Sequence, residues 1–395
     1  MSRVSPWGRV AVLAITTSLI AAACSDDDDS ADSTKGDASS NSSSSASAGK
    51  TGGGPSLKGV CPDPLVVQTD WFPEPEHGGL YELIGTDGKA DAGKGTYTGE
   101  LANTGINLEI RAGGPFLGGS STSAQMYADQ DIFMGYVATD ELIKDSAKTP
   151  LVSVVSPLEK SPQILMWDPK AFPDIKTFED IGKTGAPVLY FEGSAYMDFL
   201  VGKGLIKKKQ IDASYDGAPS RFVTEHVFQQ GFASNEPYKY ENDIKEWKKP
   251  VKYLLIDDAG YRIYPSSLAV RPERTTKDAK CLKAVVPLMQ QAQVDYMADP
   301  KPINDFFLGY VQDMASFWTL SAAGNADAVK VLTSEGLVSN GPDKTIGNFD
   351  TARVQKLIDD STPIFKAAGV DTMKAGLKAD DIVSNEFIDT SIGLP

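Results

Sequence analysis

Short apolar runs alternate with amphipathic stretches through most of the chain after residue 62. The first run, residues 63–71, has the pattern of a buried strand that ends in polar side chains. Six further runs have a strand-like composition: residues 106–113, 131–138, 149–157, 163–169, 186–193 and 252–258. Helical patterns lie between or after several of these runs, and one helix is expected to begin near His77. Alternating strands and helices predict an α/β fold.

The last third of the chain, from about Lys277, is predicted to be mostly amphipathic helix. Apolar residues recur at three- and four-residue spacing across residues 282–298 and 303–323. We expect these stripes to pack into the core rather than to contact a ligand. His226 also falls in a helical pattern, which predicts a structural histidine.

The N-terminus has the organisation of a secretory signal. Arg3 and Arg9 precede an apolar run at residues 10–23. This run is shorter than the roughly 20 residues that a membrane-spanning helix needs. The segment LIAAAC resembles a bacterial lipobox, and this resemblance implies that residues 1–23 are removed and that Cys24 is acylated. The alternative is an ordinary cleaved signal followed by an incidental cysteine. We predict an extracytoplasmic protein held at the outer face of the cell membrane by this lipid alone.

Residues 24–60 are rich in Asp, Ser and Gly and contain almost no apolar side chain to bury, which predicts a disordered tether. A flexible chain of this length has a mean reach of roughly 30 Å. The acidic run at residues 26–29 is expected to be solvated rather than to bind a metal. After residue 60 no apolar run approaches the length of a membrane span.

The formal net charge of −15 leaves no basic face to neutralise phosphates, so nucleic acid is excluded as a partner. The chain also lacks a G-x-S-x-G element, a P-loop and a metal-spaced set of His and Cys residues. We therefore expect no metal, no cofactor and no enzymatic activity.

Three cysteines occur in the chain. If Cys24 carries the lipid, Cys61 and Cys281 remain as an even pair in an oxidising compartment, which predicts a disulfide between the start and the later half of the folded part. The alternative is two separate buried thiols.

The segment TDWFPEPEHGGLYEL contains Trp71, Pro73 and His77. It resembles the opening of the family that joins the thiamine-pyrimidine synthases of fungi with bacterial binding proteins for pyrimidine precursors, riboflavin, sulfonates, taurine and nitrate. Further likenesses follow in order along the chain, at residues 149–157, 188–201, 215–241 and 294–300.

This resemblance implies the two-lobed periplasmic-binding-protein type II fold, with a ligand cleft between the lobes. Lobe one would comprise residues 61–156 and 268–395 with the C-terminal helices, and lobe two residues 157–267. Two regions depart from the family pattern: YADQDIFMG at residues 127–135 and an insertion at residues 86–99. Contacts from those regions cannot be carried over.

In open α/β sheets a ligand lies beyond the carboxyl ends of the strands, so the residues that follow the predicted strands are the candidates. Together with the resemblance, this rule selects Asp70, Trp71, His77, Tyr136, Glu192, Gly193, Ser194, Tyr196, Asn235, Glu236, Tyr238 and Tyr264 as ligand-binding residues.

Several candidates have an alternative structural role. Trp71 could stack on a planar ring or pack beneath the next helix, and His77 could line the pocket or support it. The loop at residues 192–194 could offer backbone N–H groups to a ligand oxygen, or Ser194 could simply be a helix N-cap. Asn235 and Glu236 could read the amine and carbonyl groups of a heterocycle, or form a solvated turn.

The resemblance implies a monomeric substrate-binding lipoprotein of an ABC importer, which delivers a small heterocyclic nutrient such as a pyrimidine thiamine precursor or riboflavin to a permease and its ATPase. A binding protein for sulfonate, taurine or nitrate is the alternative. A synthase is disfavoured because the dense cysteine cluster of those enzymes is absent after residues 252–258. A lipoprotein adhesin or sensor is a third class. The sequence determines neither the ligand nor the cognate permease.

Overall fold

The computed structural model describes residues 55–395, which belong to one compact unit. The predicted signal, the lipidation of Cys24 and the tether up to residue 54 lie outside the described residues. Leu57 was expected to belong to the tether, but it is buried, and its backbone N–H donates to the Thr104 carbonyl at 2.9 Å. The folded chain therefore begins before Cys61, because this leucine packs into the core.

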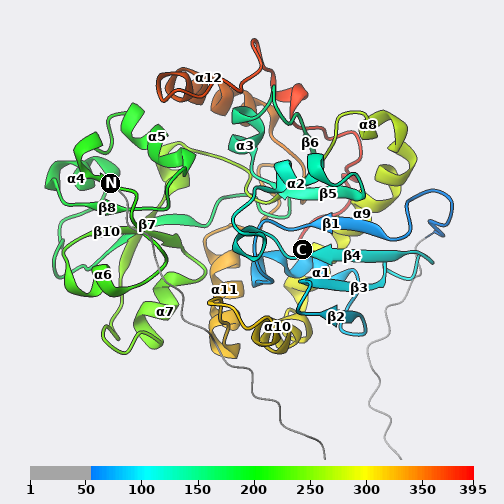
Figure 1. The fold of residues 1–395 in the computed structure, drawn as a ribbon, viewed down its shortest axis with the longest axis horizontal. Helices are drawn as coiled ribbons and strands as arrows, with labels where there is room; N and C mark the ends of the chain where they lie inside the picture. The colour runs from blue at the N-terminus through cyan, green and yellow to red at the C-terminus, as the bar shows by residue number, and fades with distance from the viewer. Residues whose placement is uncertain (1–54) are drawn as a thin grey trace, which may run out of the picture. The chain divides into compact units, whose positions relative to one another are not determined.

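Two sheets organise the described chain (Figure 1). The strand order is β2-β3-β4-β1-β5-β12-β6 in the seven-stranded sheet and β11-β7-β10-β8-β9 in the five-stranded sheet. The strands of the first are β1 (Leu65–Gln68), β2 (Lys89–Asp91), β3 (Thr96–Glu100), β4 (Asn107–Arg111), β5 (Ile132–Val137), β6 (Val152–Val155) and β12 (Ser267–Val270). The strands of the second are β7 (Gln163–Trp167), β8 (Val188–Leu189), β9 (Ile211–Asp212), β10 (Phe228–Phe232) and β11 (Lys252–Leu255).

The predicted strand β1 lies inside the seven-stranded sheet, where it pairs in parallel with β4 and β5. All four of its residues are buried, as expected for an interior parallel strand covered on both faces. Because parallel strands end at the same edge, the segments that follow β1, β4 and β5 meet there. Asp70 and Trp71 come from the first of these segments.

The insertion at residues 86–99 contains secondary structure that its sequence did not predict. It forms β2 and most of β3, an antiparallel pair that extends the sheet beyond β4. Tyr97 is buried there; its hydroxyl donates to the Gly85 carbonyl at 2.6 Å, and its ring lies 4.4 Å from that of Phe306. This anchoring explains why the segment folds as a sheet edge rather than as a longer loop.

Helices surround both sheets (Figure 1). Their bounds are α1 (Gly78–Glu82), α2 (Thr122–Ala128), α3 (Thr139–Lys144), α4 (Phe178–Thr184), α5 (Ala195–Gly202), α6 (Ser220–Thr224), α7 (Glu236–Asn242), α8 (Arg274–Lys277), α9 (Ala279–Ala298), α10 (Lys301–Asp313), α11 (Ala322–Ser334) and α12 (Thr351–Ala367). Short 3₁₀ turns include η1 (Pro75–His77), η2 (Gly114–Leu117), η3 (Lys208–Gln210), η4 (Ile256–Ala259) and η5 (Ala379–Asp381). No helix among residues 55–395 is long and apolar enough to cross a membrane.

Two helix predictions need correction. His226 is exposed between α6 and β10, because α6 ends at Thr224. The continuous helix expected over residues 303–323 is instead α10 and α11 joined by a loop, in which Ala315 has a φ of 50°. No glycine or proline marks this break in the sequence, so the apolar periodicity concealed it.

The predicted disulfide is confirmed. Cys61 and Cys281 are bonded across a sequence separation of 220 residues, with their Cα atoms 5.0 Å apart. Cys281 is buried in the first turn of α9. The bond therefore joins the segment before β1 to the longest helix described, α9.

Arg353 on α12 holds both segments that connect the two sheets. Its guanidinium donates to the Glu159 carboxylate at 2.7 Å and to the Glu159 carbonyl at 2.8 Å, on the segment between β6 and β7. It also donates to the carbonyls of Ile263 at 2.7 Å and Arg262 at 3.0 Å, on the segment that returns to β12. We call this set of contacts the Arg353 clamp.

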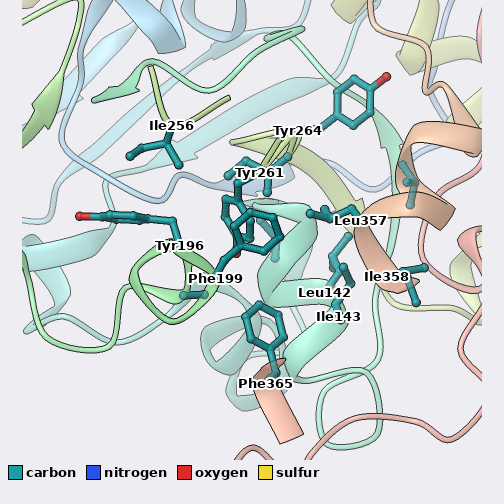
Figure 2. Close-up of a cluster of buried hydrophobic side chains, with 14 of the residues drawn as sticks. Leu142, Ile143, Tyr196, Phe199, Ile256, Tyr261, Tyr264, Leu357, Ile358 and Phe365 are labelled. Carbon is teal, nitrogen blue, oxygen red and sulfur yellow. The ribbon is translucent and has the colours of Figure 1, made fainter. Parts of the chain in front are cut away.

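A buried cluster beside this clamp joins α3, α5 and α12 (Figure 2). The ring centroids of Phe199 on α5 and Tyr261 lie 4.8 Å apart, and Leu357 and Phe365 project from α12. The cluster fixes the elements on either side of the two connecting segments.

Candidate ligand-binding site

A cavity of about 660 Å³ lies where the edges of the two sheets face each other. Its walls include Asp70, Trp71 and Ser266 from segments next to strands of the seven-stranded sheet, and Gln163, Gln230 and Phe232 from the five-stranded sheet. The loop between α10 and α11 adds a further wall. This volume is in the range of small-molecule sites in proteins.

The end of β1 places Asp70 and Trp71 on the wall. One Asp70 oxygen lies 2.9 Å from His77 Nε2, and the other accepts a hydrogen bond from Ser266 Oγ at 2.6 Å. The turn that follows β4 packs tightly behind them: a Cβ added to Gly113 would lie 1.9 Å from the Thr69 carbonyl oxygen. The absence of a side chain at Gly113 therefore permits the close approach that fixes this strand end.

Aromatic side chains form one side of the cavity. Trp71 meets Trp318 edge to face, with ring centroids 5.8 Å apart, and Phe317 in the same way at 6.5 Å. Trp318 also donates from Nε1 to the Pro73 carbonyl at 3.4 Å. Phe317 is 68% exposed, so its ring is open to the solvent at the cavity.

The opposite side also presents aromatic rings. Phe191 and Tyr215 pack with centroids 4.8 Å apart, and Phe232 and Tyr238 follow from β10 and α7. Phe191 and Phe232 are among the few large apolar side chains of the described residues that remain exposed. A planar ligand could thus meet rings from both sides of the cavity.

The charged groups of the lining are strongly unbalanced. Six carboxylates line the cavity, from Asp70, Glu74, Glu76, Asp140, Glu236 and Asp243, whereas Lys239 is the single lysine or arginine among the described lining residues. Burial raises the pKa of Glu76, Asp140 and Glu236, because the ionised form loses hydration.

Most of these carboxylates already have protein partners. Glu76 accepts a short hydrogen bond from Ser234 Oγ, and Asp140 accepts one from the Tyr261 hydroxyl at 2.7 Å. Glu236 folds back over Gly231 and accepts from the Phe232 N–H at 2.6 Å and from Asn235 Nδ2 at 3.0 Å. Their oxygens thus serve partly to hold the cavity walls.

Glu74 differs from Asp70, Glu76, Asp140 and Glu236. No hydrogen bond among the described residues involves its side chain, and His77 Nε2, which is bonded to Asp70, lies 3.7 Å away. Burial, followed by repulsion from Glu76, Asp70 and Glu236, holds the pKa of Glu74 well above its usual range. A positive group near Glu74 would relieve both effects.

Lys239 faces the same space from α7. Its Nζ lies 4.5 Å from the centroid of the Trp318 ring, and no ion pair among the described residues involves it. Burial lowers the pKa of Lys239, against the opposing influence of Glu236 and Glu74. The ammonium thus occupies the face of an aromatic ring that also lines the cavity.

Six of the residues selected from sequence line this cavity: Asp70, Trp71, Ser194, Asn235, Glu236 and Tyr238. Ser194 does not cap its helix through its side chain; its Oγ donates to the Phe191 carbonyl at 2.7 Å. Glu192 and Gly193 are exposed in the same loop but lie outside the lining. The loop contributes to the cavity through Phe191 and Ser194.

The other selected residues lie behind the walls. His77 is 1% exposed and positions Asp70, and Tyr136 packs against the His77 ring at 5.1 Å. Tyr196 and Tyr264 lie in the buried cluster of Figure 2. The Tyr196 hydroxyl donates to Gln230 Oε1, a lining residue, at 2.9 Å, whereas the Tyr264 hydroxyl accepts from the Asp350 N–H at 2.8 Å. These side chains are buried because their hydroxyls find partners inside the protein.

Sequence reasoning missed Glu74, Lys239, Phe317 and Trp318. Glu74 and Lys239 lie within the segments that carry the family resemblance, and their charge was the feature that could have identified them. Phe317 and Trp318 were assigned to a core stripe because the helix was expected to continue past Asp313. Within residues 55–395, no group of three or more His, Cys, Asp or Glu side chains is arranged to hold a metal ion.

No family model and no curated protein matches this chain. Solved structures do resemble it. The periplasmic aliphatic sulphonate binding protein SsuA from Escherichia coli aligns with a TM-score of 0.52 at 13% identity, covering 78% of this chain and 89% of that one. The alkanesulfonate-binding protein SsuA from Xanthomonas axonopodis pv. citri, bound to MOPS, aligns with a TM-score of 0.52 at 12% identity, covering 82% of this chain and 100% of that one.

At such low identity these likenesses concern the fold alone. They agree with the two sheets and surrounding helices described above. The chain has the periplasmic-binding-protein fold, as the resemblance in its sequence implied.

Proposed function

We propose that this protein is the extracytoplasmic solute-binding lipoprotein of an ABC importer and that it delivers a small planar heterocycle to the permease and its ATPase. One observation chiefly supports this: a cavity of about 660 Å³ is lined by aromatic rings and carboxylates from both sheets. Stacking on a planar ring contributes ~0.5–1.5 kcal/mol per aromatic pair beyond burial. The carboxylates accept hydrogen bonds from ring or exocyclic amines.

In this proposal the two sheets belong to two lobes, residues 61–156 with 268–395 and residues 157–267. Closure of the lobes over the ligand is the signal that the permease reads. The two connecting segments at the Arg353 clamp would be the hinge, because they are the links between the sheets along the chain.

The candidate ligands are a pyrimidine thiamine precursor and riboflavin. Both combine a planar ring with amine or imide donors, which suits carboxylate acceptors near aromatic faces. The solved sulfonate-binding proteins resemble the chain in fold, but an anion would require concentrated positive charge or donors. Here one lysine stands against six carboxylates in the described lining, so we rank sulfonate, taurine and nitrate below the heterocycles.

The same cavity supports binding rather than catalysis. Of the polar groups that face it, most are held by wall residues, such as Asp70 by His77 and Ser266. A synthase role therefore ranks below transport. A sensor or adhesin with the same fold would bind a ligand without a permease, which a transport assay distinguishes.

A thermal-shift screen followed by calorimetry tests the proposal. The purified protein is mixed with hydroxymethylpyrimidine, riboflavin, taurine, an alkanesulfonate or nitrate. A ligand that binds only the folded state raises the Tm in proportion to RT ln(1 + [L]/Kd). We expect a heterocycle to raise it and the anions to leave it unchanged. A shift with the alkanesulfonate alone would contradict the proposal.

Lipid attachment is tested separately, since Cys24 lies outside the described residues. Metabolic labelling with a fatty-acid probe should mark the wild-type protein and not the Cys24→Ser variant. Equal labelling of both proteins would contradict the anchor without touching the ligand assignment.

A further inference from the structure

The carboxylate of Glu74 lines the cavity without a hydrogen-bonded cationic partner among the described residues. Glu74 faces it without a hydrogen bond among the described residues, while Asp70, Glu76 and Glu236 surround it and disfavour its ionised form. A carboxylate largely withdrawn from water, as this one is with its side chain 17% exposed, is costly unless it is paired. The neighbouring carboxylates of Asp70, Glu76 and Glu236 are occupied by Ser266, Ser234 and the Phe232 N–H. Glu74 has only the His77 ring, 3.7 Å away and already bonded to Asp70, so of these four it is the one left for a ligand.

An ammonium already lies on the aromatic face nearby. Lys239 Nζ is 4.5 Å from the Trp318 centroid, and Trp318 in turn contacts Trp71. The ring face therefore accepts a cation in the unliganded protein. Lys239 forms no ion pair among the described residues, so nothing but this ring and the nearby carboxylates fixes its ammonium.

Accordingly, we propose that the ligand carries a positive charge, as an organic ammonium or an equivalent heterocyclic cation, and that Lys239 occupies its position until it binds. The ligand cation would lie between Glu74 and the face of Trp318, with Trp71 at its side. The Lys239 ammonium, at the end of a flexible side chain, would move toward solvent. This inference rests on the proposed function and narrows its ligand class from planar heterocycles to cationic ones.

The role of Lys239 distinguishes the proposed cation site from an anion site. If the ligand were an anion, Lys239 would be its main attraction, and removing the lysine would abolish binding. If the ligand is a cation, Lys239 competes with it, and removing the lysine strengthens binding. The sign of a single substitution therefore separates the two arrangements.

Two matched probes isolate the charge. Aminomethylpyrimidine and hydroxymethylpyrimidine have nearly the same shape, but the first carries an ammonium where the second has a hydroxyl. Tetramethylammonium and methanesulfonate serve as minimal probes of opposite charge that need no heterocycle recognition. Binding is measured by calorimetry and by the quenching of tryptophan fluorescence.

The variants are Lys239→Met, which keeps an unbranched stem of similar length without the ammonium, and Glu74→Gln, which keeps the shape of the side chain. Lys245→Met and Glu241→Gln are matched controls, because both residues are exposed and lie outside the cavity lining. We expect the ammonium probes to bind roughly three- to tenfold more tightly to Lys239→Met and roughly tenfold more weakly to Glu74→Gln. Both controls should match the wild type.

The possible results separate the inference from the function on which it rests. The inference is overturned if neither ammonium probe shows saturable binding. It is also overturned if hydroxymethylpyrimidine binds as tightly as its amino counterpart. Saturable binding of methanesulfonate that Lys239→Met abolishes overturns it as well. If tetramethylammonium binds as expected while no heterocycle does, the cationic class stands and the proposed heterocyclic function fails.

Discussion

The Arg353 clamp and the acidic cavity both bury charge, but they treat it in opposite ways. At the clamp, the Arg353 side chain is only 4% exposed, and its guanidinium donates to four oxygens on the two connecting segments. In the cavity, Glu74 has no hydrogen bond among the described residues, and Lys239 has no carboxylate partner there. Buried charge that is fully paired serves the architecture, whereas buried charge that is left unpaired indicates where a ligand would bind.

The largest expected effect is at the clamp. Arg353→Met leaves the Glu159 carboxylate and three carbonyl oxygens without their donor. We expect the free energy of unfolding to fall by ~3–5 kcal/mol, as when one member of a buried charge pair is removed. Urea unfolding followed by circular dichroism measures it. Lys356→Met, an exposed change on the same helix, is the control, with an effect below ~0.5 kcal/mol. A loss of under ~1 kcal/mol for Arg353→Met would show that the clamp is replaceable.

The second prediction concerns ligand affinity and leaves the clamp intact. Trp71→Ala removes ring surface from the cavity wall and the edge contacts with Trp318 and Phe317. We expect it to weaken the binding of the heterocycle found in the screen by ~1–3 kcal/mol, roughly ten- to a hundredfold. Calorimetry provides the value. Trp247→Ala is a tryptophan control outside the cavity lining, and unchanged affinity in Trp71→Ala would remove Trp71 from the site.

The third prediction has the opposite sign to the first. Glu74→Gln removes a largely buried charge that has no hydrogen bond among the described residues, while keeping the side-chain shape. We expect the free protein to gain ~0.5–2 kcal/mol of stability, because the cost of burying that carboxylate disappears. Urea unfolding measures the free energy of unfolding of Glu74→Gln and of the control variant Glu241→Gln. Destabilisation by Glu74→Gln would mean that the carboxylate has a structural partner in solution, which would break the contrast with the clamp.

The smallest effect is the dependence of stability on pH. Burial raises the pKa of Glu74, Glu76, Asp140 and Glu236 in the folded protein. The folded state therefore binds protons more readily than the unfolded state, and the Tm should rise as pH falls from about 7.5 to about 5.5. Aspartates with lowered pKa, such as Asp212, oppose this only at lower pH, near and below their unfolded value of ~3.9.

Scanning calorimetry at several pH values measures this slope. The slope should be shallower in Glu74→Gln, since one of the acids whose pKa is raised by burial is then absent. A cationic ligand should show the reverse behaviour, with weaker binding as pH falls, because protonation of Glu74 competes with it. A Tm that falls steadily over this range would contradict the assignment of buried, unpaired acids to the cavity.

The sequence by itself determined features that depend on local pattern or on simple counting. The apolar run at residues 63–71 contains the interior strand β1, and the two residues at the end of the run, Asp70 and Trp71, lie on the cavity wall. The two cysteines left after Cys24 form the predicted disulfide. Such features survive because strand burial and cysteine pairing require little knowledge of which other segments come close.

Only the tertiary structure decided which side chains face the cavity. Tyr264 and Tyr196 looked like site residues from their positions after strands, yet partners inside the protein hold both in the core. Phe317 and Trp318 looked like core because their spacing is helical, yet Ala315 breaks the helix and directs them to the cavity. Glu236 was selected as an acceptor for a ligand, but its carboxylate accepts from the Phe232 N–H at the end of β10, while Glu74 has no hydrogen bond among the described residues. Whether a polar group is satisfied depends on neighbours distant in sequence, and periodicity contains no information about them.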